Sequence, residues 1–131
     1  MTNNQERIQL TETALAGGWW IVIGAALCMA LLLGLTPEGS LREELGYGLR
    51  VSARLAFAAL LIAYIARPWR QLTGGGRWLL RHRRYFGLAA ALTHTVHFGY
   101  IVALFMLTDE VLEVTTAIFG GLAYVLIWIV A

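Results

Sequence analysis

The sequence predicts an all-α integral membrane protein, a bundle of four transmembrane helices, and three observations support this fold class. The 131 residues are 59% hydrophobic and only 14% charged, whereas a soluble domain is roughly 45–50% apolar and about 25% charged. Four long apolar segments alternate with short polar ones. Most of the arginines gather in the middle connection, as expected of a loop that stays on the cytoplasmic side of a membrane.

The first expected helix covers residues 15–35 and follows a polar N-terminal tail of residues 1–14. It contains no charged residue, and about 20 residues at about 1.5 Å each match a hydrocarbon core of about 30 Å. The polar stretch that includes Pro37 ends this helix, because proline lacks the amide proton that the next helical turn needs. We therefore expect a retained membrane helix here.

The second expected helix covers residues 49–66 and ends before Pro68, and a loop of residues 67–84 follows it. Arginine-rich loops are retained in the cytoplasm. This loop is therefore expected to face inward and to meet anionic lipid headgroups, with docking of a partner protein as a secondary role. It contains three consecutive glycines, two tryptophans and six arginines: Gly74, Gly75, Gly76, Trp69, Trp78, Arg67, Arg70, Arg77, Arg81, Arg83 and Arg84.

The third and fourth expected helices cover residues 85–107 and 114–131, with a short acidic turn between them. With the arginine-rich loop inside, this turn lies outside and both termini lie in the cytoplasm. The chain is then a multi-pass protein of the inner (plasma) membrane, with one transmembrane domain over residues 15–131. Its net charge of +2 is too small to predict a nucleic-acid partner.

Small side chains recur at helical spacing on the two middle helices. Such residues permit close approach of helices in lipid, where van der Waals contact replaces hydrophobic burial. We expect these two faces to pack against each other. They comprise Ser52, Ala56, Ala59 and Ala63 on one helix, and Gly87, Ala90 and Ala91, which lead to His94 and His97, on the other.

His94, His97 and Arg54 are the candidate functional residues among the ionisable groups within the expected spans. Such groups are costly in a bilayer unless they face a partner, so they are candidates for function. A neutral imidazole in a low dielectric is a good axial ligand for haem iron, and its second ring nitrogen can be held by a neighbouring hydroxyl or backbone carbonyl. The alternative is a histidine that forms a hydrogen bond between helices. Arg54 either extends to the lipid headgroups or pairs with a haem propionate.

Three motifs carry a resemblance to a known family. They are Ser52-Ala53-Arg54-Leu55-Ala56, Arg67-Pro68-Trp69-Arg70 and Arg83-Arg84-Tyr85-Phe86-Gly87-Leu88. In addition, His97 follows Gly87 by ten residues and is itself followed by Tyr100. Over about residues 48–130 the chain thus resembles the ferric reductase-like transmembrane domain family. That family includes the haem-binding membrane subunit of bacterial methionine sulfoxide reductase and, more distantly, NADPH oxidases.

The resemblance implies a haem b electron-transfer subunit in which His97 ligates the iron, whereas His94 has no counterpart in the motif. Such a subunit takes electrons from a cytoplasmic flavin or quinone donor and passes them across the bilayer. It is at most the membrane part of an oxidoreductase. Members similar to this chain form bundles of about six helices with the opposing ligand histidines on the fifth, whereas this chain ends in the fourth and has no histidine after His97. A second axial ligand is therefore expected from a partner subunit, another copy or a missing continuation.

Two other classes of function stay open. The chain can be a noncatalytic membrane scaffold or a truncated relative without cofactor, whose histidines form hydrogen bonds between helices. A transporter has less support, because the sequence shows neither an acidic site nor a broken helix within a span. His82, which lies among the arginines of the loop, is expected to be solvated.

Overall fold

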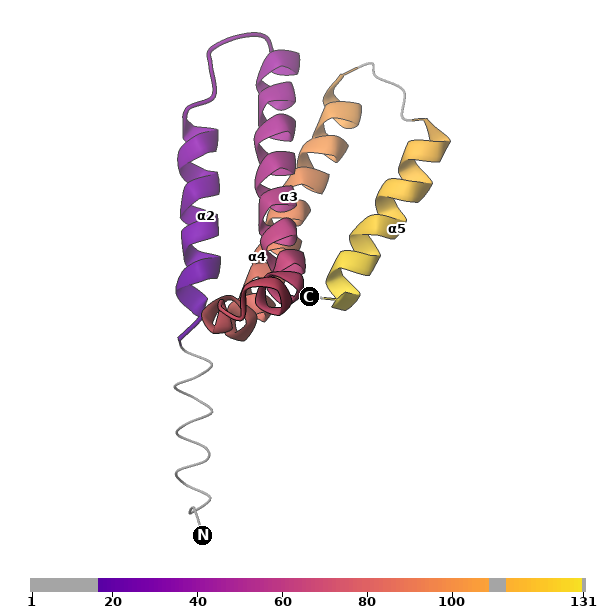
Figure 1. The fold of residues 1–131 in the computed structure, drawn as a ribbon. Helices are drawn as coiled ribbons and strands as arrows, with labels where there is room; N and C mark the ends of the chain where they lie inside the picture. The colour runs from indigo at the N-terminus through magenta and orange to yellow at the C-terminus, as the bar shows by residue number, and fades with distance from the viewer. Residues whose placement is uncertain (1–16, 109–112, 131) are drawn as a thin grey trace, which may run out of the picture.

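The computed structural model describes residues 17–108 and 113–130, and within them it contains four α-helices and no strand. Consecutive helices run in opposite directions, so that each is antiparallel to the next (Figure 1). The predicted all-α class is confirmed. The predicted tail of residues 1–14 lies outside the described residues. The helices are α2 (Trp19–Gly34), α3 (Leu41–Thr73), α4 (Arg77–Leu107) and α5 (Val114–Val130).

Two of the four helices, α3 and α4, are long and apolar enough to cross a membrane. The other two are apolar but shorter, with 16 residues in α2 and 17 in α5. At about 1.5 Å per residue, these two helices fall somewhat short of a hydrocarbon core of about 30 Å. By length and composition, α3 and α4 could each cross a membrane. The predicted bundle of four spans needs the shorter helices as well.

Residues 67–84, expected to be a loop, are helical except at the three glycines that separate α3 from α4. The expectation that α3 ends before Pro68 is wrong, because the helix continues through this proline to Thr73. An internal proline removes one backbone hydrogen bond and bends a helix, but it need not end it. The glycines end α3 instead. Gly74 and Gly76 have positive φ values of 68° and 75°, which glycine adopts without steric cost.

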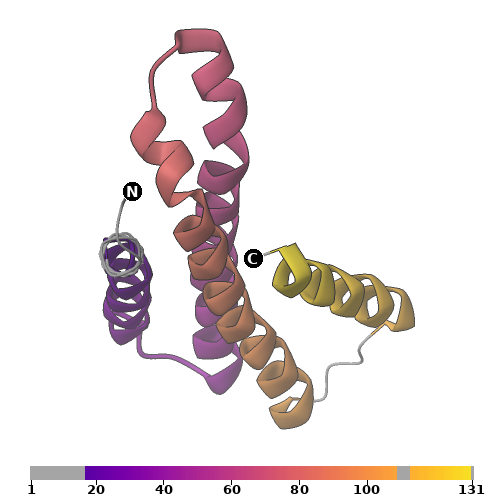
Figure 2. The ribbon, with the colours of Figure 1, turned by 90° about the horizontal axis from the view of Figure 1, so that it is seen from below.

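The bend in α3 turns the arginine-rich segment away from the axis of the bundle. Figure 1 shows α3 changing direction toward its C-terminal end. Seen along the bundle in Figure 2, the end of α3 and the start of α4 project together to one side. With 33 residues, α3 is much longer than the span of about 20 residues that a bilayer needs. The arginine-rich segment is therefore a helical hairpin, which we call the arginine hairpin (residues 67–84).

The opposite end of α3 also extends beyond the predicted segment, which began at residue 49. Ser40 caps this end, since its side chain accepts a hydrogen bond from the Glu43 N–H, and the Glu43 carboxylate accepts one from the Ser40 N–H at 2.9 Å. The Ser40 backbone N–H, and then its hydroxyl, hold the pKa of the Glu43 carboxyl below its usual range. This capping box satisfies backbone donors that the first turn leaves free.

The core of the bundle is the contact between α3 and α4, which is the most extensive between any two helices. The predicted small-residue faces meet here, since most of the buried positions on both helices are small, although Ala59 and Gly87 are only partly buried. Helix α2 packs on α4 through Ile21 and Val22 against Tyr85, and α5 lies along the far side of α4 (Figure 1). The buried small residues are Gly48, Ser52, Ala56, Ala63 and Ala66 on α3, and Ala89, Ala90, Ala91 and Thr93 on α4.

Gly48 is a point of close contact between the two helices. A Cβ atom at this position would lie 2.3 Å from Cε1 of the Tyr100 ring, well inside van der Waals contact. Only a residue without a side chain fits here unless Tyr100 moves. Gly46, in the same helix, is a natural control, since a Cβ there would meet only an Arg50 guanidinium nitrogen at 3.7 Å.

We expect Gly48→Ala to destabilise the bundle and Gly46→Ala to leave it unchanged or slightly more stable. Alanine gains about 0.5–1 kcal/mol over glycine inside a helix, whereas overpacking costs about 1–3 kcal/mol, so the clash with Tyr100 should dominate at Gly48 alone. The measurement is the free energy of unfolding during titration of the protein in mixed micelles with SDS. Equal stability of the two variants would contradict close contact at Gly48.

Candidate functional site

The two candidate histidines lie on α4 and border one cavity between α3, α4 and α5. This cavity, which we call the histidine cavity, has a volume of about 170 Å³. Its walls are mostly apolar and come from α3 and α5 as well as α4. The residues that line it are Ala53, Ala56, Phe57, Leu60, Ala90, His94, His97 and Ile127.

A hydrogen bond across the helix contact orients His97. Its Nδ1 atom lies 3.1 Å from Oγ of Ser52, a fully buried residue of α3. The Ser52 hydroxyl also lies 2.6 Å from the carbonyl oxygen of Gly48. The carbonyl oxygen of Leu49 lies 3.2 Å from this hydroxyl as well. Because carbonyl oxygens only accept, we assign the single hydroxyl proton to these carbonyls, so that Oγ accepts a hydrogen bond from the His97 Nδ1–H. The lone pair of neutral His97 is then on Nε2.

His94 has no comparable partner. Its ring centroid lies 5.5 Å from that of His97 and 6.0 Å from that of Tyr124 on α5. Within the residues that the structure describes, no hydrogen bond to the His94 ring is found. Ring packing therefore holds the His94 ring, whereas a hydrogen bond to a hydroxyl orients the His97 ring.

The geometry of the two histidines limits what they can bind together. They lie one turn apart on one face of α4, so their imidazoles approach the cavity from the same side. They cannot coordinate one haem iron from opposite faces. Within the described residues there is also no group of three or more His, Cys, Asp or Glu side chains that could hold a bare metal ion. The donor set thus offers one imidazole at a time to a ligand, and of the two rings only that of His97 has a hydroxyl at its second nitrogen.

Arg54, the third candidate, lies apart from the histidines. Its side chain is exposed on α3 and does not line the histidine cavity. Ser52 and Ala56, two residues before and two residues after Arg54, face α4. Arg54 therefore projects from a different side of α3. Of the two interpretations of Arg54, its exposed position suits extension to lipid headgroups better than contact with a group at His97.

Polar contacts that the sequence analysis missed attach α5 to α4 beside the histidines. The Thr95 hydroxyl lies 3.2 Å from the Tyr124 hydroxyl, and Trp128 donates its indole N–H to Thr95 at 3.3 Å. The rings of Phe98 and Tyr124 also stack, with centroids 5.1 Å apart. Thr95 is one residue from His94, so the sequence did place a hydroxyl near the site. A single sequence does not show which helix packs against Thr95.

His82 is not solvated, and that prediction is wrong. It is buried in a cluster of aromatic rings, 4.9 Å from Trp78 and 6.3 Å from Tyr85 between ring centroids. Its Nδ1 lies 2.9 Å from the Trp78 carbonyl oxygen, one helical turn earlier. The prediction failed because α4 begins at Arg77, so that Trp78 and His82 share the face that meets Trp20 of α2.

A second, larger cavity of about 640 Å³ lies next to the histidine cavity, at the base of the arginine hairpin. We call it the arginine cavity. Leu60 and Ile127 line both cavities, so the two are neighbours along α3, α4 and α5. The histidine cavity alone is smaller than the roughly 300–1,000 Å³ of typical ligand pockets. A large planar ligand at His97 would therefore need the space of both cavities or an outward movement of α5.

Comparison of the chain with models of protein families, with curated proteins and with solved structures finds no match.

Proposed function

We propose that this chain is a haem b electron-transfer subunit of a membrane oxidoreductase, in which Nε2 of His97 is an axial ligand of the iron. The supporting observation is the hydrogen bond between His97 Nδ1 and Ser52. Histidine ligands usually donate their second ring N–H to a fixed acceptor, which sets the tautomer and raises the basicity of the ligating nitrogen. Ser52 is such an acceptor, and its full burial holds it in place.

Haem b, when bound, would supply one-electron redox chemistry, which the side chains of this chain lack. The protein orients the imidazole through Ser52 and excludes water with the apolar walls of the histidine cavity. The donor in this proposal is a cytoplasmic flavin or quinone, and the acceptor lies across the bilayer. His97 would hold the group from this chain, and any second histidine ligand would have to come from a partner subunit, a second copy or a further segment of the protein, because His94 approaches from the same side as His97.

A noncatalytic scaffold is the alternative function, and the same hydrogen bond favours it. A link between Ser52 and His97 fastens α3 to α4 whether or not an iron is present, and interhelical hydrogen bonds of this kind contribute about 0.6 kcal/mol on average in membranes. The two functions differ in what they require of Nε2. Electron transfer needs this atom free for iron, whereas a scaffold does not use it.

The proposal includes insertion of all four helices into the inner membrane, with the arginine hairpin in the cytoplasm. Apolar side chains are exposed along every helix, as expected of a surface in contact with lipid. The six arginines of the hairpin lie at one end of the bundle, together with the aromatic cluster around His82. The acidic residues that the structure describes are Glu38, Glu43, Glu44 and Glu113, and they lie at the other end, in the connections or in the first turn of α3. This asymmetry follows the distribution typical of inner-membrane proteins.

Labelling of single cysteines tests the orientation. In a Cys28→Ala background, a cysteine at Gly75 should react with a membrane-impermeant maleimide only after the cells are permeabilised, because the arginine-rich segment is retained inside. A cysteine at Glu38, at the opposite end, should react in intact cells. The reverse pattern would contradict the proposed orientation.

Spectra of histidine variants test the cofactor. In membranes that contain the chain and its native partners, a reduced-minus-oxidised difference spectrum after dithionite should show a sharp haem band. His97→Ala should abolish this band, and His94→Ala should retain it. Ser52→Ala should weaken haem binding by about 10–100-fold, as loss of an outer-shell partner typically does.

Two results would overturn the assignment. Loss of the band in His94→Ala but not in His97→Ala would make His94 the ligand. Absence of the band in the wild type would leave the scaffold as the function. Arg54→Gln is the matched control, because Arg54 lies outside the histidine cavity and its loss should leave the band unchanged.

A further inference from the structure

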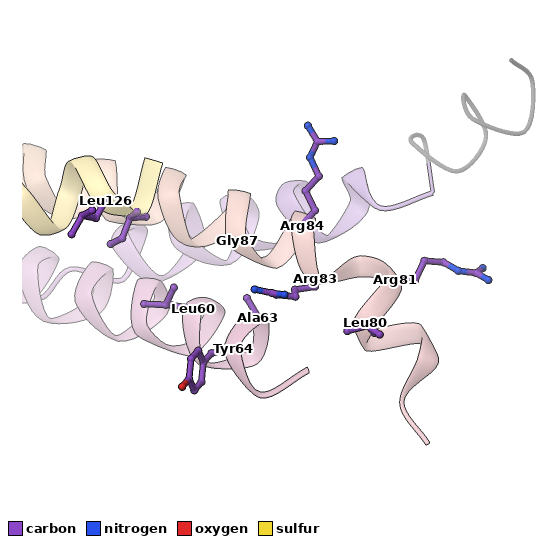
Figure 3. Close-up of a pocket in the computed structure, with 10 residues that line it drawn as sticks. Leu60, Ala63, Tyr64, Leu80, Arg81, Arg83, Arg84, Gly87 and Leu126 are labelled. Carbon is purple, nitrogen blue, oxygen red and sulfur yellow. The ribbon is translucent and has the colours of Figure 1, made fainter. Parts of the chain in front are cut away.

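The arginine cavity combines an apolar wall with a basic opening. Its apolar part comes from Leu60 and Ala63 of α3 and from Leu126 and Ile127 of α5, and Arg81, Arg83 and Arg84 of α4 border its other side. Figure 3 shows the Arg83 side chain extended along the gap toward Ala63 and Leu60, whereas Arg81 and Arg84 point away. Arg83 is therefore the cation at the opening of the cavity.

No acidic side chain compensates Arg83 within the residues that the structure describes. Across residues 17–108 and 113–130, no hydrogen bond or ion pair of its guanidinium is found, and the four acidic residues lie at the opposite end of the bundle. Arginines on neighbouring turns of the hairpin add to the positive potential. No described acidic side chain neutralises the positive charge at the opening of the arginine cavity. This charge is therefore complementary to an anionic ligand.

The position of the cavity indicates which class of anion it can bind. It opens at the end of the bundle where the arginine hairpin turns aside, and the exposed Trp69 and Trp78 rings lie on this hairpin. Tryptophan and arginine gather at the level of the lipid headgroups. The apolar wall continues from Arg83 past Leu60 toward the histidine cavity, in the direction of the membrane interior. A ligand that fits has an anionic head and an apolar chain on one molecule.

We propose that the arginine cavity binds one anionic phospholipid, whose phosphate pairs with Arg83 and one of whose acyl chains lies against Leu60 and Leu126. A guanidinium presents paired donors that match the oxygens of a phosphate. A volume of about 640 Å³ falls within the range of about 300–1,000 Å³ of ligand sites. The inference rests on the membrane insertion proposed above and does not require haem. Because Leu60 and Ile127 line both cavities, haem and the lipid could be bound together only with α5 moved outward.

Native mass spectrometry of the full chain, released from detergent micelles, tests the site. The probes are dioleoylphosphatidylglycerol, dioleoylphosphatidylcholine and glycerol phosphate, which is the anionic head without chains. One phosphatidylglycerol should stay bound per chain, while phosphatidylcholine and glycerol phosphate should dissociate. Arg83→Gln should weaken phosphatidylglycerol binding about five- to tenfold, the size expected for one arginine next to an anionic lipid.

Arg77→Gln is the matched control, because it removes the same charge from the same hairpin but does not line the cavity. It should change binding by less than about twofold. Equal losses in Arg77→Gln and Arg83→Gln would show a diffuse basic surface and overturn the site. Equal retention of the two phospholipids would also overturn it, as would binding of glycerol phosphate as tight as that of phosphatidylglycerol. Circular dichroism of both variants checks that they remain helical.

The labelling experiment separates this inference from the proposal on which it rests. If cysteines at Gly75 and Glu38 label from opposite sides but phosphatidylglycerol shows no preference, the lipid site alone is wrong. If neither cysteine is protected by a membrane, insertion itself is wrong, and the lipid site falls with it.

Discussion

Close packing of α3 against α4 depends on side chains small enough for the two backbones to approach. Gly48 leaves room for the ring of Tyr100, and one turn later Ser52 meets His97. In lipid such contact supplies attraction that burial of apolar surface cannot. A larger residue at either position would separate the helices and, with them, Ser52 from His97. The orientation of the candidate ligand thus follows directly from the packing of the fold.

The faces of α3 and α4 that do not take part in this contact have other roles. Ser52, Ala56 and Ala63 of α3 pack against α4. The exposed side of α3 carries large apolar residues such as Phe57 and Tyr64. Helix α5 adds a third wall beside α4, and the histidine and arginine cavities lie one after the other along that wall. In the proposed function, a redox site near mid-membrane and a lipid site near the headgroups share one cleft.

Much of the fold could be predicted from the sequence, because the helices and their packing faces follow local patterns of residues. The small residues at helical spacing identified the faces of α3 and α4 that meet, and the family resemblance singled out His97 through its distance from Gly87. The lengths of α3 and α4 were not predicted. Pro68 was read as the end of a helix, although Gly74 and Gly76 end it, and the capping box of Ser40 and Glu43 was overlooked. Contacts between distant segments, such as Thr95 with Tyr124, have no signal in a single sequence.

The account depends most on the hydrogen bond between Ser52 and His97, and the nitrogen-15 NMR spectrum of the histidine rings tests it most directly. In the full chain, labelled at histidine and placed in bilayers before haem is added, His97 should carry its proton on Nδ1 and a lone pair on Nε2. The resonances are assigned with His82→Gln, His94→Gln and His97→Gln. Ser52→Ala should remove the preference for this tautomer. A His97 ring protonated on Nε2, or a spectrum that Ser52→Ala leaves unchanged, would contradict the account.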